Sequence, residues 1–161
     1  MNIHKYQLKV QWTGNTGQGT TSYKSYSRSY TVWTDTKSEI HGSSDPAFRG
    51  DPTKYNPEEL LLASLSSCHM LWYLHLCSEA GIVVVDYVDH AKGIMFEAED
   101  GGGQFSEVML QPIVTVTDSD MIQRANELHK TANKLCFIAR SVNFEVKHSP
   151  VCHVDSGITL I

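Results

Sequence analysis

The residues in this sequence best suited to chemistry are two cysteines, Cys68 and Cys136. Cys68 closes the segment Asn-Pro-Glu-Glu-Leu-Leu-Leu-Ala-Ser-Leu-Ser-Ser-Cys at 56–68, and Cys136 lies in Lys-Leu-Cys-Phe-Ile-Ala-Arg-Ser. Thiols react as thiolates, so a nucleophilic cysteine needs a positive charge nearby. Two cysteines in separate apolar helices are more typical of thiol redox chemistry than of a disulfide scaffold. The competing interpretation of Cys68 is a buried structural thiol.

Length and composition limit the class of protein. The 161 residues, 41% of them apolar, predict one domain over 1–161, with a core at about 5–148 and an extended tail at 149–161. A net charge of −5 without a basic stripe argues against a nucleic-acid partner. No uninterrupted apolar segment of the signal-peptide kind opens the chain, so we expect a reducing, cytoplasmic location.

The order of elements predicts an α+β fold. We expect helices on one side of an antiparallel sheet, in the order β-β-α-β-β-α-β. The expected strands are 6–12, 20–34, one or two within 82–98, 105–117 and 142–148, and the second helix is 118–140. A long loop runs to residue 55, and loops of this length often act as lids. Asp45 and Asp51 are expected to form turns within it.

The first helix has clear ends in the sequence. Asn56 is a good N-cap, Pro57 fits the first helical position, and Glu59 can close a capping box. Gly81 provides the stop, giving a helix of about 24 residues. Residues 60–77 are apolar for long enough to raise the question of a membrane span, but they include serines and histidines. A buried central helix, and no membrane, is the interpretation we adopt.

The spacing between Glu58 and Cys68 has a geometric consequence. Ten residues of straight helix span about 15 Å, which is too far for one arginine to pair with Glu58 and also touch Cys68. Either the helix is kinked, or Glu58 of one chain serves Cys68 of another. The second option predicts a homodimer with shared sites.

The segment 56–68, together with Cys136 in a later apolar helix, resembles the OsmC/Ohr family, which comprises osmotically inducible protein C and the organic hydroperoxide resistance proteins. The resemblance covers roughly residues 5–148 and implies an OsmC-like fold, an intertwined homodimer around long central helices. It further implies a peroxidase in which the Cys68 thiolate attacks an organic hydroperoxide and Cys136 resolves the sulfenic acid to a disulfide. An external dithiol, lipoyl-type in this family, would reduce that disulfide, with no bound cofactor or metal.

This sequence differs from the family at the arginine that activates the thiolate. In the family it pairs with a glutamate that matches Glu58 here. Some relatives carry it in the first glycine-rich turn, which here is 14–19 and holds no arginine. Arg49 lies near the position that other relatives use, and Arg28 shares a strand face with two tyrosines. Because an inward-facing arginine needs a carboxylate, Arg28 with Glu58 is ranked first and Arg49 second.

The other polar residues receive structural interpretations. His69 points about 100° away from Cys68 around the helix, whereas His75 returns to its face. Both are expected to pack within the helix or against a partner. His129 and Arg140 are expected to be solvated or capping, and Cys77 to be a buried thiol. The neighbouring apolar side chains are expected in the core or in dimer contacts, and some of them to line a pocket: Met70, Leu71, Trp72 and Leu74.

Three functions remain open from the sequence. The first is a peroxidase that prefers organic hydroperoxides to hydrogen peroxide, because an apolar pocket favours an alkyl group. The second is a non-enzymatic redox sensor or small-ligand-binding protein of the same fold. The third is metal binding, either by Cys68, Cys136 and His75, or by a set in the tail that consists of His148, Cys152 and His153.

Overall fold

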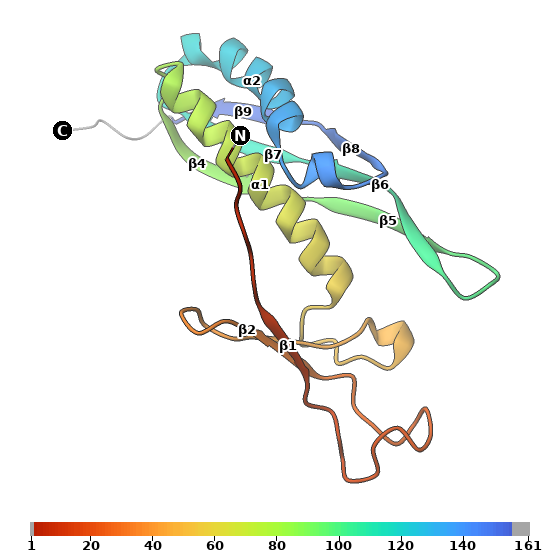
Figure 1. Ribbon diagram of the computed structural model, residues 1–161. Helices are drawn as coiled ribbons and strands as arrows, with labels where there is room; N and C mark the ends of the chain where they lie inside the picture. Colours follow the sequence, from red (N-terminus) through yellow and green to blue (C-terminus); the bar gives the residue numbers. More distant parts are fainter. Residues whose placement is uncertain (1, 156–161) are drawn as a thin grey trace. The chain divides into compact units, whose positions relative to one another are not determined.

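The structure is a computed structural model that describes residues 2–155 (Figure 1). The end of the predicted tail, 156–161, lies outside the described residues. The chain separates into two compact units, residues 1–61 and 62–161, and the boundary falls in the second turn of the long helix α1. Each unit is described by itself below.

The first unit is built on a three-stranded antiparallel sheet. Its strands are β1 (Lys9–Trp12), β2 (Tyr30–Trp33) and β3 (Ile40–Gly42), in the order β1-β2-β3. The predicted strand 20–34 is wrong over its first half, because residues 20–29 form turns and a single bridge. Asn15 causes this locally, since its Oδ1 accepts the backbone N–H groups of Gly17 and Gly19, both at positive φ.

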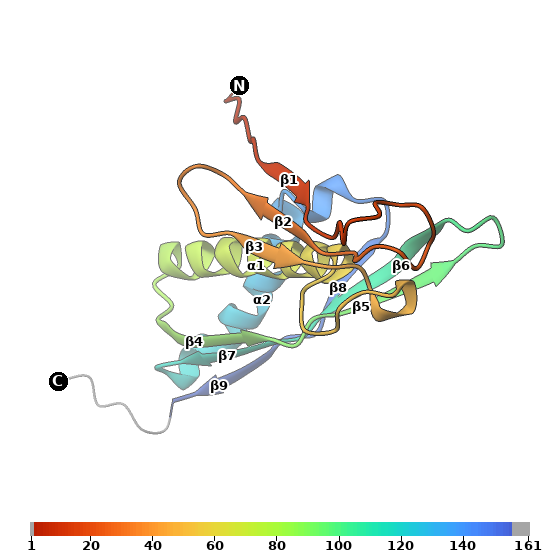
Figure 2. The ribbon, with the colours of Figure 1, turned by 90° about the horizontal axis from the view of Figure 1, so that it is seen from below.

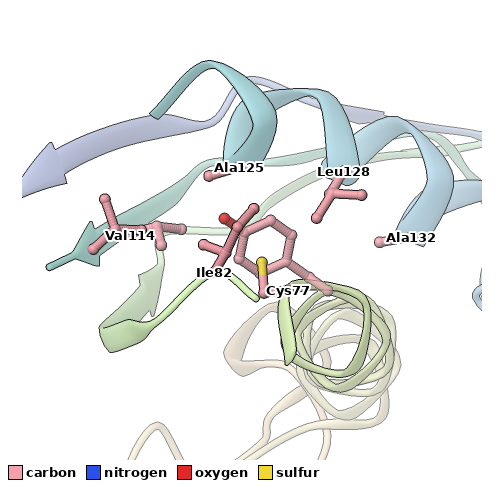
Figure 3. Packing of buried hydrophobic residues seen from close by; sticks show 8 residues of the cluster. Cys77, Ile82, Val114, Ala125, Leu128 and Ala132 are labelled. Atoms are coloured by element: carbon pink, nitrogen blue, oxygen red, sulfur yellow. The ribbon is translucent and has the colours of Figure 1, made fainter. Parts of the chain in front are cut away.

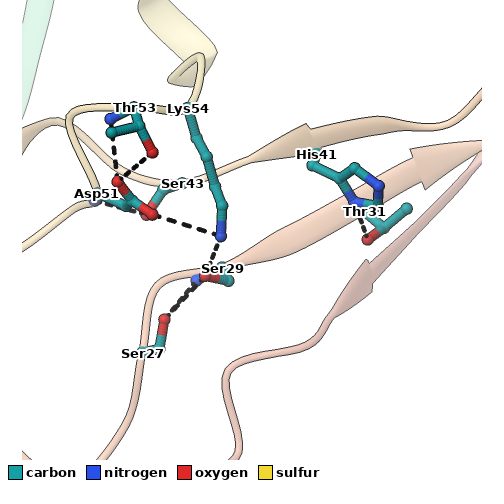
Figure 4. A network of polar contacts seen from close by, with 8 residues as sticks. All are labelled: Ser27, Ser29, Thr31, His41, Ser43, Asp51, Thr53 and Lys54. Atoms are coloured by element: carbon teal, nitrogen blue, oxygen red, sulfur yellow. Dashed lines mark hydrogen bonds and ion pairs between the residues drawn. The ribbon is translucent and has the colours of Figure 1, made fainter.

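The long loop of the first unit is ordered by polar contacts (Figure 4). The Lys54 ammonium donates to Ser29 Oγ at 3.0 Å and pairs with the Asp51 carboxylate at 3.5 Å. Asp51 Oδ1 accepts the N–H and the hydroxyl of Thr53, as a turn residue does. Asp45 likewise caps the 3-10 helix η1 (Pro46–Phe48), so the turn roles predicted for both aspartates are confirmed.

Helix α1 (Pro57–Glu79) has the ends that the sequence predicts. Glu59 N donates to Asn56 Oδ1 at 2.8 Å, and Asn56 N donates to Glu59 Oε2 at 3.0 Å, which is a capping box. Gly81, at φ +70°, follows the last turn. The helix is long and apolar enough to cross a membrane by length and composition. Here it packs one fully buried stripe into the second unit: Leu65, His69, Tyr73 and Cys77.

The second unit contains two three-stranded sheets (Figures 1 and 2). One has the order β4-β7-β9, and the other β5-β6-β8. The bounds are β4 (Val84–Asp89), β5 (Lys92–Glu97), β6 (Gly103–Leu110), β7 (Pro112–Val116), β8 (Glu145–His148) and β9 (Val151–Val154). The predicted strand 105–117 is therefore two strands in different sheets, and part of the predicted tail is a strand.

The expectation of an antiparallel sheet is corrected in part. β4 pairs with β7 and β5 with β6 antiparallel, but β8 runs parallel to β6 and β9 parallel to β7. The chain passes through a helix between β7 and β8, and a crossover of this length permits parallel pairing. Asp89 holds the corner between sheets, since its Oδ1 accepts Gln111 N at 2.7 Å and its Oδ2 accepts the Ser66 hydroxyl of α1.

The second helical region is shorter than predicted. Asp118 caps the 3-10 helix η2 (Ser119–Met121), and α2 (Ile122–Leu135) follows. Cys136 adopts an extended backbone and ends α2, and a further 3-10 helix, η3 (Ala139–Ser141), comes after it. The prediction of a single helix over 118–140 is thus wrong at both ends. Cys136 lies just beyond a helix rather than within one.

The core of the second unit lies between the two helices and the β4-β7-β9 sheet (Figure 3). α1 contributes Tyr73 and Cys77, β7 contributes Val114 and Val116, and α2 contributes an apolar stripe: Ala125, Leu128 and Ala132. These side chains are at most 5% exposed. The buried thiol predicted for Cys77 is confirmed. Leu71, by contrast, is 63% exposed, so it is not in this core.

Candidate functional site

Two thiols face each other in the second unit. Cys68 lies half-buried on α1, and Cys136, 1% exposed, lies directly after α2. Both are free thiols, and their side chains share a hydrogen bond. Burial in the first place, and then this contact, raise the pKa of the Cys136 thiol to about 11. Packing of α1 against α2 therefore joins the two cysteines that the sequence singles out.

The backbone fixes the position of the Cys136 sulfur. Ala139 N donates to Cys136 Sγ at 3.4 Å, at the start of η3. The amide of Cys136 donates to Ala132 O at 2.9 Å, which anchors the residue to the last turn of α2. Amide donors at the sulfur favour the thiolate, but burial outweighs them. At neutral pH Cys136 is therefore a protonated thiol held beside Cys68.

Apolar side chains surround the Cys68 face of α1. Leu71, Trp72 and His75 follow Cys68 at spacings of three, four and seven residues, and they line a shallow pocket of about 210 Å³. Phe137, next to Cys136 and 65% exposed, packs edge-on against Trp72 with ring centroids 5.6 Å apart. An apolar surface thus adjoins the thiol pair. We call these residues the apolar face: Leu71, Trp72, His75 and Phe137.

A buried pair of histidines joins α1 and α2. His69 Nε2 and His129 Nδ1 are 2.9 Å apart, and both side chains have no exposed area. Burial, and then the neighbouring His148, lower the pKa of His69 to about 4. Burial, and then His69 and His148, lower the pKa of His129 to about 3. The prediction of a solvated or capping His129 is wrong, because the position joins the buried stripe of α2 between Ala125 and Ala132.

The predicted activating residues all belong to the first unit. Arg28 donates to the backbone carbonyls of Tyr26 and Tyr23, each at 2.7 Å, and its guanidinium lies over both rings at 4.1 and 4.2 Å. Within the described first unit these carbonyls and rings, rather than Glu58, are the partners that Arg28 has. Rings and carbonyls satisfy a guanidinium without a carboxylate, which sequence patterning does not reveal.

Arg49 and Glu58 have separate surroundings in that unit. Arg49 is exposed, and its positive φ of 67° closes η1. Glu58 is half-buried, and its charge, after burial, helps to raise the pKa of the Tyr30 hydroxyl.

The metal interpretations find no support in the described residues. Within 2–155, no group of three or more histidine, cysteine, aspartate or glutamate side chains is arranged to hold a metal ion. Cys152 of β9 packs against the core cluster, and His153 is exposed.

Comparison with known proteins agrees with this architecture. A model of the OsmC-like protein family matches residues 50–150. The chain belongs to the OsmC-like family. The match contains α1, both thiols and both sheets of the second unit up to β8, so the family assignment rests on the elements that build the site.

Individual known proteins are similar to this one over nearly the whole chain. An OsmC-like protein of unknown function from Vibrio cholerae O1 biovar eltor is 30% identical, with a TM-score of 0.83, and the match covers 92% of this chain and 100% of that one. The uncharacterized protein YmaD of Bacillus subtilis (strain 168) is 24% identical over 151 residues, 91% of this chain and 92% of that one. An organic hydroperoxide resistance protein from Elizabethkingia anophelis shares the fold, at 19% identity and a TM-score of 0.66, covering 94% and 99%.

Proposed function

We propose that this protein is a thiol-dependent peroxidase that reduces organic hydroperoxides. The observation that carries the proposal is the hydrogen-bonded contact between the half-buried Cys68 and the buried Cys136, next to an exposed apolar face. Membership of the OsmC-like family and the shared fold of organic hydroperoxide resistance proteins agree with a role in redox chemistry.

The reaction divides between the two thiols. The Cys68 thiolate attacks one oxygen of the hydroperoxide, the O–O bond breaks, and the alkoxide takes up a proton to leave as an alcohol. Cys68 then carries a sulfenic acid. The Cys136 sulfur attacks that sulfenic sulfur, and the hydroxide leaves as water with the proton of the Cys136 thiol. An external dithiol of the lipoyl type returns two electrons and two protons, and both thiols are regenerated.

The raised pKa of Cys136 assigns the first step to Cys68. A thiol with a pKa of about 11 is almost entirely protonated at pH 7, so it does not compete with Cys68 for the peroxide. The proton it carries is also the proton that the departing hydroxide needs. We propose that Arg28 or Arg49 stabilises the Cys68 thiolate, as the family resemblance implies.

We propose a cytoplasmic homodimer as the working form. In the second unit, three neighbouring apolar side chains of β5 are 38% to 56% exposed: Ile94, Met95 and Phe96. The first unit has an exposed apolar set of its own: Ile3, Tyr6, Leu8 and Val10. Exposed apolar sets of this kind are typical of surfaces that a second copy covers. Light scattering at micromolar concentration should give twice the 18.0 kDa mass of the chain.

A non-enzymatic redox sensor is the second candidate. The observation in its favour is that the Arg28 guanidinium already has the Tyr26 and Tyr23 carbonyls as partners. Steady-state consumption of cumene hydroperoxide with a dithiol separates the two functions. The peroxidase requires many turnovers per subunit, whereas a sensor oxidises once and stops.

The apolar face predicts the substrate preference. We expect Leu71→Ser and Phe137→Ser to raise the KM for cumene hydroperoxide about tenfold each, because each loses on the order of 50 Å² of apolar contact with the alkyl group. The KM for hydrogen peroxide should not change, since that molecule has no apolar part to bury. Val88→Thr, at a similarly apolar and exposed position on β4, is the matched control. Equal effects on both peroxides would contradict the assignment of the apolar face.

A further inference from the structure

The buried histidine pair occupies a particular place relative to the two thiols. His69 follows Cys68 directly on α1, and His129 precedes Cys136 by seven residues, or two turns of α2. The rings are nearly parallel, at 8°, with centroids 5.3 Å apart. The hydrogen bond between them therefore joins the two elements that carry the thiols.

The surroundings of the histidine pair offer its rings no other hydrogen-bond partner among the described residues. The titratable side chains packed around it are Tyr73 of α1, Tyr87 of β4 and His148 of β8. Tyr73 stacks on His129 with centroids 3.8 Å apart. The outer nitrogens, His69 Nδ1 and His129 Nε2, are buried and have no partner among the described residues. A buried imidazole that moved out of register would lose its remaining hydrogen bond, which is costly in an apolar core.

We propose that the His69–His129 hydrogen bond is a positioning element that sets α1 against α2 and so holds Cys68 within reach of Cys136 for disulfide formation. Its part in turnover rests on the proposed peroxidase function. The contact between the Cys68 and Cys136 thiols, on which the hydrogen bond acts, does not depend on that function.

The composition of α1 explains why such an element is needed. The helix carries apolar side chains on several faces, including the exposed Leu71 and the buried Leu65, so apolar packing alone distinguishes poorly between rotations of the helix. A disulfide is demanding by comparison, because its Cα atoms must lie about 4.4–6.8 Å apart. A shift of one residue moves a helical position by about 1.5 Å along the axis and 100° around it. One buried polar pair can fix register where apolar contacts cannot.

A two-step thiol assay measures the predicted effect directly. Cys68 attacks 4,4′-dithiodipyridine, the reagent's S–S bond breaks, and one thiopyridone leaves. Cys136 then attacks the mixed disulfide, and the second thiopyridone leaves as the Cys68–Cys136 disulfide forms. The reagent accepts the two electrons that the thiols lose. The second step is unimolecular, so its rate reports how well Cys136 reaches Cys68.

We expect His129→Phe and His69→Phe, in a Cys152→Ala background, to slow the second step at least tenfold and to leave the first unchanged. His129→Asn and His69→Gln place an amide where the bonded ring nitrogen lies, and should restore the second step to within about twofold. His148→Gln is the matched control, since it removes a ring of the same cluster without touching the hydrogen bond. Peptide mapping identifies the bridged cysteines, and circular dichroism checks the fold.

A second measurement does not depend on the phenylalanine variants. The pKa of His69 is lowered to about 4 and that of His129 to about 3, so both imidazoles are neutral above pH 6. One added proton leaves the N–H···N hydrogen bond in place, and the bond is lost only when both rings are protonated, at a pH of about 3. The second-step rate of the wild type, divided by that of His129→Asn, should stay constant from pH 8 to 6. We expect it to fall about twofold by pH 3, with circular dichroism checking the fold at each pH.

The outcomes separate the two proposals. A second step as fast in His129→Phe as in the wild type, no rescue by His129→Asn, or a rate ratio that does not change with pH would each overturn the positioning role. A wild type that forms the disulfide rapidly with the reagent but consumes no peroxide would refute the peroxidase and leave the positioning role standing.

Discussion

We expect Cys68→Ser to abolish peroxide turnover, and Cys136→Ser to convert the protein into one that oxidises once and stops. Cys68 is half-buried beside the apolar face, whereas Cys136 is 1% exposed with its pKa raised to about 11. Serine has a hydroxyl in place of the thiol, and that hydroxyl is not ionised at neutral pH. Cys68→Ser therefore loses the first step, and we expect a fall in kcat of at least a thousandfold. In Cys136→Ser the sulfenic acid has no resolving thiol, so it persists until an external thiol reaches it.

Dimedone labelling followed by mass spectrometry checks this division of roles. Cys136→Ser should carry one dimedone adduct, on Cys68, after a single equivalent of cumene hydroperoxide. Cys77→Ser is the matched control, because Cys77 is a buried cysteine of the same helix at 1% exposure, and it should keep turnover if it folds. A dimedone adduct on Cys77 or Cys152, or full turnover in Cys68→Ser, would contradict the assignment of the two thiols.

We expect the free energy of unfolding to fall steeply as the pH drops from about 6.5 to about 4, with the histidine pair causing much of that fall. In the unfolded chain both imidazoles bind protons below their ordinary pKa of about 6.5. In the folded protein they stay neutral until the pH approaches about 4 for His69 and about 3 for His129. The unfolded state therefore binds more protons in this range, and stability rises with pH.

The size of the effect follows from the two pKa shifts. A shift of about 2.5 units on one imidazole corresponds to about 3 kcal/mol of stability, present above pH 6.5 and lost by pH 4. His129→Asn removes one titrating group, so the slope of the unfolding free energy against pH should decrease by about 1.4 kcal/mol per pH unit between 4.5 and 6. Urea unfolding at fixed protein concentration, repeated at each pH, measures this slope.

A surface histidine provides the control for that slope. His90→Gln changes an exposed histidine on the loop after β4 and should leave the slope as in the wild type. If His129→Asn and the wild type have the same slope, the pair is not buried and neutral in solution, and its positioning role loses its basis.

The ends of α1 could be predicted because their causes are local. Asn56 and Glu59 form a capping box at the start of the helix, and Gly81 adopts a left-handed backbone conformation after its end. The turn roles of Asp45 and Asp51 have the same origin. These features depend on the order of residues along the chain and on no distant partner.

The arrangement of the site depended on contacts that the sequence does not encode locally. The contact of Cys68 with Cys136 requires α1 and α2 to pack in one register, although the two cysteines are 68 positions apart in the chain. His129 looks like a surface residue until its spacing from Ala125 and Ala132 places it on the buried stripe. β8 pairs in parallel with β6, and β9 with β7, because the chain crosses over through α2. Alternation of residues within a strand does not reveal this pairing.

A single-turnover reaction tests the central claim most directly. Reduced protein is mixed with one equivalent of cumene hydroperoxide in the absence of a dithiol, and cumyl alcohol and the oxidised cysteines are measured together. We predict one alcohol per subunit and one disulfide, which joins the peptides that contain Cys68 and Cys136. Alcohol release without that disulfide, or the disulfide without alcohol release, would contradict a peroxidase that works through this pair of thiols.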